Sequence, residues 1–266
     1  MDIVQIITLA IIQGLTEFLP VSSSGHLILS HHLLGWPDQG QAFDVAVHFG
    51  TAIAVIGYFR KDLGNIVHGW LSSHKTKQET ADSRMGWGII IGTIPACVVG
   101  LLIKVILDDD LLRSPLIVAT TLIFFGLLLG WATLKCKGQR GVDTLSIKDM
   151  FLIGCAQSIA LIPGTSRSGI TITAGLSMGL TPVAAARFSF LLSIPAILMA
   201  SGLHVIKLIT SPEAANWGDM IIGAGVATVT AFLCIHYFLK LIQKINMIPF
   251  VVYRVVMGLY LFYLFV

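Results

Sequence analysis

The sequence predicts an all-α polytopic membrane protein, with about six transmembrane helices and two re-entrant helical hairpins arranged as an inverted-topology repeat. Of its 266 residues, 55% are hydrophobic and only 12% are charged, whereas a soluble domain carries about 25% charged residues. The apolar residues also form runs long enough for a helix to cross a hydrocarbon layer of roughly 30 Å. Most of the chain is therefore expected to face lipid.

Six apolar segments have the length of single membrane-spanning helices. They cover residues 43–59, 86–106, 115–134, 183–206, 217–239 and 246–266. The apolar run at 3–12 has no basic segment before it and no small-residue cleavage site after it. We therefore expect it to belong to the mature protein rather than to a signal peptide.

Two further segments, 3–35 and 150–180, are apolar at both ends and polar in the middle. Their interruptions are LPVSSSG at 19–25 and PGTSRSG at 163–169. Non-helical backbone within a bilayer is tolerated only where protein or water satisfies its polar groups. Each segment is therefore predicted to form a re-entrant hairpin, whose two ends return to the same side of the membrane.

The basic residues predict the orientation of the chain, because basic loops stay in the cytoplasm. They concentrate in two segments predicted to be loops, with Arg60, Lys61, Lys75, Lys77 and Arg84 in 60–85, and Lys135, Lys137, Arg140 and Lys148 in 135–148. The loops 107–114 and 207–216 then lie outside. This orientation accounts for the net charge of +3, so we infer no nucleic-acid binding.

Traced in this way, residues 1–266 form one membrane domain. A first repeat at 1–134 and a second at 150–266 run in opposite directions, joined by a cytoplasmic linker at 135–149. A shift of 144 residues aligns Gln13 with Gln157, Ser22 with Ser166, Ser24 with Ser168, and Gly25 with Gly169. In such folds the interrupted helices meet near the midplane and form the site between the repeats.

The first hairpin carries an ionisable residue in an apolar stretch. Glu17 lies four residues after Gln13, so both share one helix face, and burying a carboxylate in the membrane is costly unless a partner compensates. Oxygen ligands suit Mg²⁺ or Ca²⁺, so Glu17 and Gln13 are predicted to bind a divalent cation together with substrate phosphate and water. A structural alternative is a carboxylate that pairs with Arg167 or caps a helix.

The serine-rich turn that follows predicts an anion site at a helix start. Hydroxyl and backbone N–H groups there suit an anion, so Ser22 and Gly25 are expected to bind substrate. Ser23 or Ser24 is a candidate nucleophile with His26 as its base or acid, because a serine hydroxyl needs activation. His26 itself or an activated water are the other candidate nucleophiles. Alternatively, the serines only cap the helix and His26 is an interfacial histidine.

The second hairpin carries an arginine at membrane depth. The planar fork of Arg167 matches phosphate oxygens, and Gly164 permits close approach of the backbone to a ligand. The remaining residues predicted to bind substrate are Ser166, Ser168 and Thr171. The alternative is that Arg167 only neutralises Glu17.

Other polar residues give weaker signals. Asp44 and His48 suit the entrance of a site or a membrane interface equally well. Arg187 and Arg254 are predicted near cytoplasmic helix ends, with their charged groups reaching toward water. The two hairpins together supply a carboxylate, an arginine, a histidine and hydroxyl groups, which is the set that phosphoryl transfer requires.

Two motifs, QGLTEFLPVSSSGH at 13–26 and PGTSRSGIT at 163–171, are similar to the (E/Q)xxxE and PGxSRSxxT signatures of the bacitracin-resistance family, the undecaprenyl-diphosphate phosphatases. The sequence resembles this family over essentially its whole length. The family residues carried over are Gln13, Glu17, Ser23, Ser24, His26, Ser166, Arg167, Ser168 and Thr171. Many members have Glu where this chain has Gln13, which leaves Gln13 a weaker metal ligand.

The resemblance implies hydrolysis of undecaprenyl diphosphate to undecaprenyl phosphate and inorganic phosphate, with a divalent cation. This reaction would recycle the lipid carrier of cell-wall synthesis and confer bacitracin resistance. It implies a bacterial cytoplasmic membrane, and because the first hairpin opens outward we expect a site that opens to the periplasm. Membrane lipid and the polyprenyl diphosphate are the expected partners, and a homo-oligomer is left open.

Two other functions fit parts of this pattern. A lipid or ion transporter or flippase could use the same inverted repeat, since many transporters place ionisable residues at the midplane. An intramembrane serine protease would need a serine dyad but has no use for the Glu17, Arg167 and cation set. A second class of membrane phosphatase, with PSGH and SR…HxxxD motifs, is excluded because no such histidine and aspartate follow Arg167.

Overall fold

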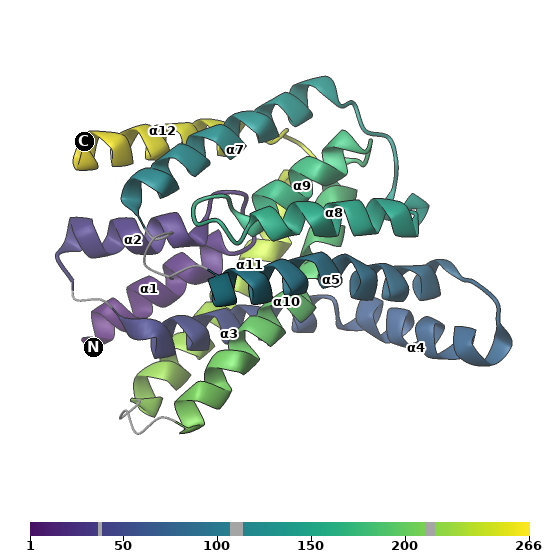
Figure 1. Cartoon of the computed structure of the whole chain (residues 1–266), viewed down its shortest axis with the longest axis horizontal. Coiled ribbons are helices and arrows are strands. Elements are labelled where there is room, and N and C mark those ends of the chain that lie inside the picture. Colours follow the sequence, from purple (N-terminus) through teal and green to yellow (C-terminus); the bar gives the residue numbers. More distant parts are fainter. Residues whose placement is uncertain (37–38, 107–113, 211–215) are drawn as a thin grey trace.

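The computed structural model describes residues 1–36, 39–106, 114–210 and 216–266. Within these ranges the chain is built from helices and contains no β-strand. Figure 1 shows them as one bundle, in which the two interrupted segments lie among the long helices. The helices are α1 (Ile3–Thr16), α2 (Ser23–Leu34), α3 (Gly40–Tyr58), α4 (Arg60–Thr76), α5 (Ala81–Ile106), α7 (Pro115–Lys135), the short 3₁₀ helix η1 (Val142–Thr144), α8 (Ile147–Ile159), α9 (Arg167–Ser177), α10 (Pro182–Thr210), α11 (Trp217–Leu241) and α12 (Ile248–Phe265).

Six of the described helices, α3, α5, α7, α10, α11 and α12, are long and apolar enough to cross a membrane. They coincide with the six predicted segments, so the prediction of a multi-pass membrane protein is confirmed. Large apolar side chains on their outer faces are exposed, among them Phe124, Ile221 and Val229. A lipid environment explains this exposure, since a soluble protein rarely leaves so much apolar surface uncovered.

The two interrupted segments pack against the long helices, although α1 and α8 each keep an exposed apolar face, as Val4 and Phe151 show. Helix α3 packs on α10 and α11, α7 packs on α12, and α5 packs on α8. The first interrupted segment forms the pair α1 and α2, and the second forms the pair α8 and α9. Helix α9 contacts α7, α8 and α10, which holds the second turn inside the bundle. Re-entry of each pair from one membrane side, and the inverted relation of the two halves, stay predictions.

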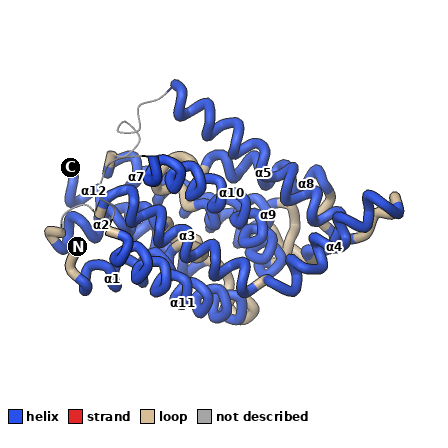
Figure 2. Tube along the Cα trace, turned by 90° about the horizontal axis from the view of Figure 1, so that it is seen from below, coloured by secondary structure: helices blue, strands red, loops and turns tan. Residues whose placement is uncertain are grey.

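The prediction that residues 60–85 form a loop was wrong. Residues Arg60–Thr76 form α4, and α5 already begins at Ala81; both helices lie side by side at one end of the molecule (Figures 1 and 2). Lys and Arg are good helix formers, so a high charge does not exclude a helix. Asp62 in the first turn of α4, and His74 and Lys75 in its last, also complement the helix dipole.

Glycine residues allow α5 and α8 to approach closely. A Cβ atom on Gly154 would overlap the carbonyl oxygen of Gly92, and one on Gly88 would overlap the Met150 side chain. Small residues at a helix interface are the usual way for membrane helices to gain packing contacts. This close contact holds α8 against α5. It therefore also helps to position the second turn, which follows α8.

We expect Gly154→Ala to destabilise the protein by about 1–3 kcal/mol, because backbone atoms of α5 must move to admit the methyl group. The measurement is thermal unfolding in detergent, followed by intrinsic fluorescence. Gly225→Ala is the matched control, since nothing lies within 4 Å of a Cβ there. Equal melting temperatures for the two variants would show that α5 and α8 are not held at this distance.

Candidate active site

The turns of the two hairpins have the same local geometry. Ser22 has φ 74° and ψ 101°, and Ser166 has φ 67° and ψ 111°. A positive φ is uncommon for a residue other than glycine. Each serine caps the following helix, since its Oγ accepts the N–H of Gly25 at 3.4 Å or of Gly169 at 3.2 Å. Strained backbone of this kind often marks functional sites.

Each turn is hydrogen-bonded to the other one. The hydroxyl of Ser168 in the second hairpin donates to the carbonyl of Leu19 in the first, at 2.8 Å. Reciprocally, Ser24 Oγ in the first hairpin accepts the backbone N–H of Gly164 in the second, at 3.2 Å. Gly164 has φ +85°, and a Cβ there would overlap Thr121 Oγ1. The two turns are therefore one structural unit, although 140 residues separate Ser24 and Gly164 in sequence.

The side chain of Arg254 joins this unit to α7. Its guanidinium is fully buried and donates to carbonyl groups of both turns and of α7. The acceptors are Pro20 at 3.5 Å, Gly164 at 3.2 Å, Thr165 at 2.8 Å, Thr121 at 3.5 Å and Leu122 at 3.3 Å. The prediction that Arg254 reaches from a helix end toward water was wrong. Its N–H groups instead donate to carbonyls of the two non-helical turns and to two carbonyls within α7.

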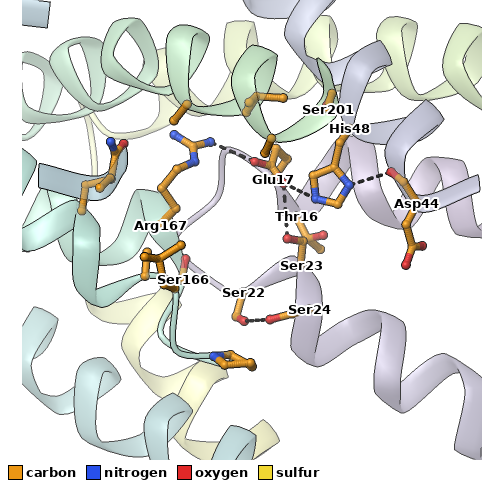
Figure 3. Close-up of a pocket in the computed structure, with 18 of the residues that line it drawn as sticks. Thr16, Glu17, Ser22, Ser23, Ser24, Asp44, His48, Ser166, Arg167 and Ser201 are labelled. Carbon is orange, nitrogen blue, oxygen red and sulfur yellow. Dashed lines mark hydrogen bonds and ion pairs between the residues drawn. The ribbon is translucent and has the colours of Figure 1, made fainter. Parts of the chain in front are cut away.

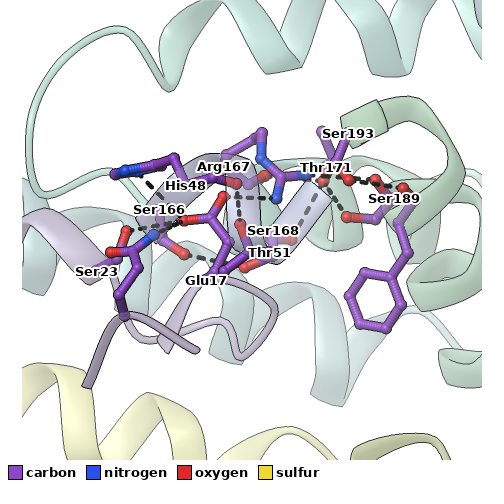
Figure 4. A network of polar contacts seen from close by, with 12 residues as sticks. Glu17, Ser23, His48, Thr51, Ser166, Arg167, Ser168, Thr171, Ser189 and Ser193 are labelled. Carbon is purple, nitrogen blue, oxygen red and sulfur yellow. Dashed lines mark hydrogen bonds and ion pairs between the residues drawn. The ribbon is translucent and has the colours of Figure 1, made fainter. Parts of the chain in front are cut away.

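Glu17 lies between the two hairpins and is surrounded by donors. Its Oε1 pairs with Arg167 Nη2 at 3.0 Å, and its Oε2 accepts from Gln13 Nε2 at 2.7 Å and from Ser23 Oγ at 3.3 Å. His48 Nε2 lies 3.6 Å from the same Oε2. Figures 3 and 4 show Ser23, His48 and Arg167 pointing toward Glu17 from α2, α3 and α9. The pairing of Glu17 with Arg167, which was the structural alternative to a functional role for either residue, is thus present.

A cavity of about 480 Å³ opens beside this ion pair. Figure 3 shows polar side chains of both hairpins and of α3 pointing into it. Its polar lining consists of Thr16, Glu17, Ser22, Ser23, Ser24, Gln41, Asp44, His48, Gln157, Ser166, Arg167 and Ser201. Its other lining residues are Val45, Ala96, Ala160, Leu161, Pro163, Gly164, Ala196, Ile197 and Ala200. The cavity therefore has a charged end and an apolar wall.

The structure brings most of the predicted site residues to this cavity. Those on its wall are Glu17, Ser22, Ser23, Ser24, Gly164, Ser166 and Arg167. The others, Gln13, Gly25, His26, Ser168 and Thr171, do not line it. Thr171 Oγ1 bonds to Ser189 Oγ at 2.7 Å (Figure 4) and donates to the Arg167 carbonyl at 2.8 Å. Such residues hold the wall in place, and their predicted chemical roles stay predictions.

Two histidines occupy different positions relative to the cavity. His26 Nδ1 donates to the Ser22 carbonyl at 2.7 Å, and its Nε2 lies 2.6 Å from the Tyr253 hydroxyl, so both ring nitrogens are engaged away from the cavity. His48 Nδ1 donates to the Asp44 carbonyl at 2.7 Å, which leaves Nε2 facing Glu17. His48 and Asp44 therefore belong to the site. Their spacing of four on one helix face was the available signal.

The arrangement suits an anionic ligand. Helix α2 starts at Ser23 and α9 at Arg167, and the first residues of both line the cavity. The N–H groups of a first helical turn have no intrahelical acceptor and carry partial positive charge. Together with the Arg167 guanidinium they form a site for phosphate oxygens.

A divalent cation in this cavity stays a prediction, and one bound there would share its ligands with a substrate. No group of three or more His, Cys, Asp or Glu residues within the described ranges could hold a metal. Two carboxylates, Glu17 and Asp44, line the cavity, and Mg²⁺ commonly takes one or two carboxylates with phosphate and water. Gln13 is fully buried outside the cavity lining, and its Oε1 has no hydrogen-bond partner in the described structure.

Comparison with known proteins agrees with this geometry. Residues 6–260 match the family model described as bacitracin resistance protein BacA. The chain belongs to this family. It is 53% identical to undecaprenyl-diphosphatase 2 of Stutzerimonas stutzeri (strain A1501) over 268 residues, covering 100% of this chain and 99% of the relative. It is 52% identical to an undecaprenyl-diphosphatase of Nitrosococcus oceani over 265 residues, which cover both chains completely.

We expect Arg254→Met to destabilise the protein by at least about 2 kcal/mol, because carbonyls of both turns lose a charged donor. Arg254→Lys should not restore stability, since a single ammonium cannot reach acceptors on both turns and α7. Thermal unfolding in detergent measures both effects. The matched control is Arg60→Met, whose exposed side chain donates to the carbonyl of Gly57, three residues away, and should matter little. A stable Arg254→Met variant would refute the role of this guanidinium.

Proposed function

We propose that this chain hydrolyses undecaprenyl diphosphate to undecaprenyl phosphate and inorganic phosphate, as an enzyme of the bacterial cytoplasmic membrane. The observation that carries the proposal is the Glu17–Arg167 pair on the wall of a cavity that two helix starts also line. The names of the relatives support a phosphatase, and none of those given above names a transporter. The reaction would recycle the lipid carrier of cell-wall synthesis and confer bacitracin resistance.

In this proposal the diphosphate lies at the charged end of the cavity while its isoprenoid chain stays in lipid. Arg167 and the N–H groups at the starts of α2 and α9 bind phosphate oxygens. The pair with Glu17 and a hydrogen bond of 3.5 Å to the Ser189 carbonyl hold the Arg167 side chain in place. A divalent cation on Glu17 and Asp44 would neutralise phosphate charge and polarise the phosphorus centre.

Among the candidate nucleophiles, the geometry favours Ser23. Its hydroxyl donates to the Glu17 carboxylate, which can take its proton. Ser24 Oγ instead contacts Ser22 Oγ at 3.1 Å and accepts the Gly164 N–H. As Ser23 Oγ bonds to the terminal phosphorus, the bridging P–O bond breaks and the lipid monophosphate leaves. Water then hydrolyses the phosphoserine, releases inorganic phosphate and restores the hydroxyl.

We further propose that the cavity opens to the periplasmic side. The predicted cytoplasmic position of residues 60–85 and 135–148 supports this orientation, because both are rich in Lys and Arg. The wall of the cavity contains neither segment. A substrate would then enter from the outer leaflet.

Phosphate release from a C15 or C55 polyprenyl diphosphate tests the reaction. We expect Glu17→Gln and Arg167→Met to lower kcat/KM by at least about 100-fold, because each removes charge from the reacting groups, and a chelator to abolish the wild-type rate. Glu79→Gln is the matched control, since Glu79 is an exposed carboxylate in a surface ion pair. Full activity in folded Glu17→Gln and Arg167→Met proteins would refute the site, and activity in chelator would refute the cation.

Labelling of a Ser24→Cys protein tests the orientation, after replacement of the native Cys97, Cys136, Cys155 and Cys234. We expect a membrane-impermeant thiol reagent outside intact spheroplasts to modify Cys at position 24. A Lys77→Cys protein is the control and should react only after permeabilisation, because Lys77 ends α4 in the predicted cytoplasmic segment. The reverse pattern would place the cavity opening in the cytoplasm.

A further inference from the structure

The side chain of Gln157 has no protein partner although it is buried. It is 3% exposed and lines the cavity, and neither its Nε2 nor its Oε1 has a hydrogen-bond partner within the described structure. Buried polar groups are nearly always hydrogen-bonded, and one that is not calls for an explanation such as a missing ligand. A buried side chain on a cavity wall, with an unpartnered donor and an unpartnered acceptor, is suited to bind a ligand there.

Comparison with the first hairpin shows why Gln157 lacks a partner. Gln13 lies near the end of α1 and donates to Glu17, four residues later. Gln157 lies at the equivalent place near the end of α8, but the residue four positions later is Leu161. The amide of Gln157 therefore has no carboxylate to bind and is left for a ligand in the cavity.

The surroundings of Gln157 indicate which part of a substrate it contacts. Just beyond the end of α8 it is followed by Ala160 and Leu161, and all three line the cavity together with Ala96 of α5. These apolar neighbours suit the start of a hydrocarbon chain, whereas Glu17 and Arg167 form the charged end. A polar group beside the apolar wall is placed for the phosphate that carries the chain.

We propose that Gln157 hydrogen-bonds the lipid-linked phosphate of the polyprenyl diphosphate, the phosphate that remains on the product. Its Nε2 donates to an oxygen of this phosphate, and its Oε1 accepts from a bound water. Gln157 thus helps to set the register of the diphosphate, so that the terminal phosphorus lies at Ser23. This inference rests on the proposed function for the identity of the ligand.

The test compares two products as ligands of the wild type and of Gln157→Met, which keeps the length of the side chain but removes both polar groups. We expect the affinity for farnesyl monophosphate, measured by thermal stabilisation of the protein, to fall about tenfold, the usual effect of losing a hydrogen bond to a charged group. The affinity for inorganic phosphate should not change. In turnover of farnesyl diphosphate, KM should rise about tenfold while kcat changes by less than about threefold.

Two further variants sharpen the comparison. Gln157→Glu keeps the size of the side chain and should weaken monophosphate binding at least as strongly, because like charges repel. Ser158→Ala is the matched control, since the Ser158 hydroxyl bonds to the Gly154 carbonyl of its own helix and does not line the cavity. It should leave both affinities unchanged.

Three results would overturn the proposal. They are an unchanged monophosphate affinity in Gln157→Met, a weakened affinity for inorganic phosphate, or a lower melting temperature of the ligand-free variant, which would indicate a structural role. Binding of the monophosphate needs no turnover. Absence of phosphate release by the wild type would therefore refute the proposed function without deciding the role of Gln157.

Discussion

The structure depends on satisfying the backbone of two non-helical turns in the middle of an apolar bundle. Lipid offers no hydrogen-bond partners, so protein groups or water in a cavity must do this. The guanidinium of Arg254 donates to Pro20 of the first turn and Gly164 of the second. These two carbonyls occupy equivalent positions in the two hairpins, since a shift of 144 residues relates them. One side chain from α12 therefore supports both turns at once.

The contacts of Arg254 with both turns also determine where the charged side chains Glu17 and Arg167 lie. Because Arg254 holds the turns together, the first residues of α2 and α9 face one cavity, and Glu17 comes within 3.0 Å of Arg167. Each charge then compensates the other, which lowers the cost of burying either one. The ion pair joins residues 150 positions apart, so the site exists only when both hairpins are in place.

The sequence was sufficient for the features that depend on composition and local pattern. Apolar runs predicted the six long helices, and the Pro, Gly and Ser residues of the interruptions predicted both turns. The position of Arg254 could not be predicted this way, because its acceptors belong to turns more than 80 residues away. The helix α4 was missed because charge was interpreted as a loop signal. His48 and Asp44 were ambiguous until α3 was placed beside Glu17.

The two hairpins have the same residues at positions that cap helices or bond to backbone. They differ at the positions of the proposed reacting groups. Ser22 and Ser166 have the same positive φ and cap the next helix in the same way. Ser24 and Ser168 each bond to the backbone of the opposite turn. By contrast, Leu161 stands at the position equivalent to Glu17, and Ile170 at that equivalent to His26.

Two turns with the same backbone geometry can bind an unsymmetric ligand, because each contributes different side chains to a common cavity. A diphosphate linked to lipid at one end is such a ligand, since one of its phosphates is released and the other is retained. The difference between the two hairpins is clearest at Gln13 and Gln157. The same amide, at the same place on its helix, donates to the carboxylate of Glu17 in one half and lies buried on the cavity wall without a protein partner in the other.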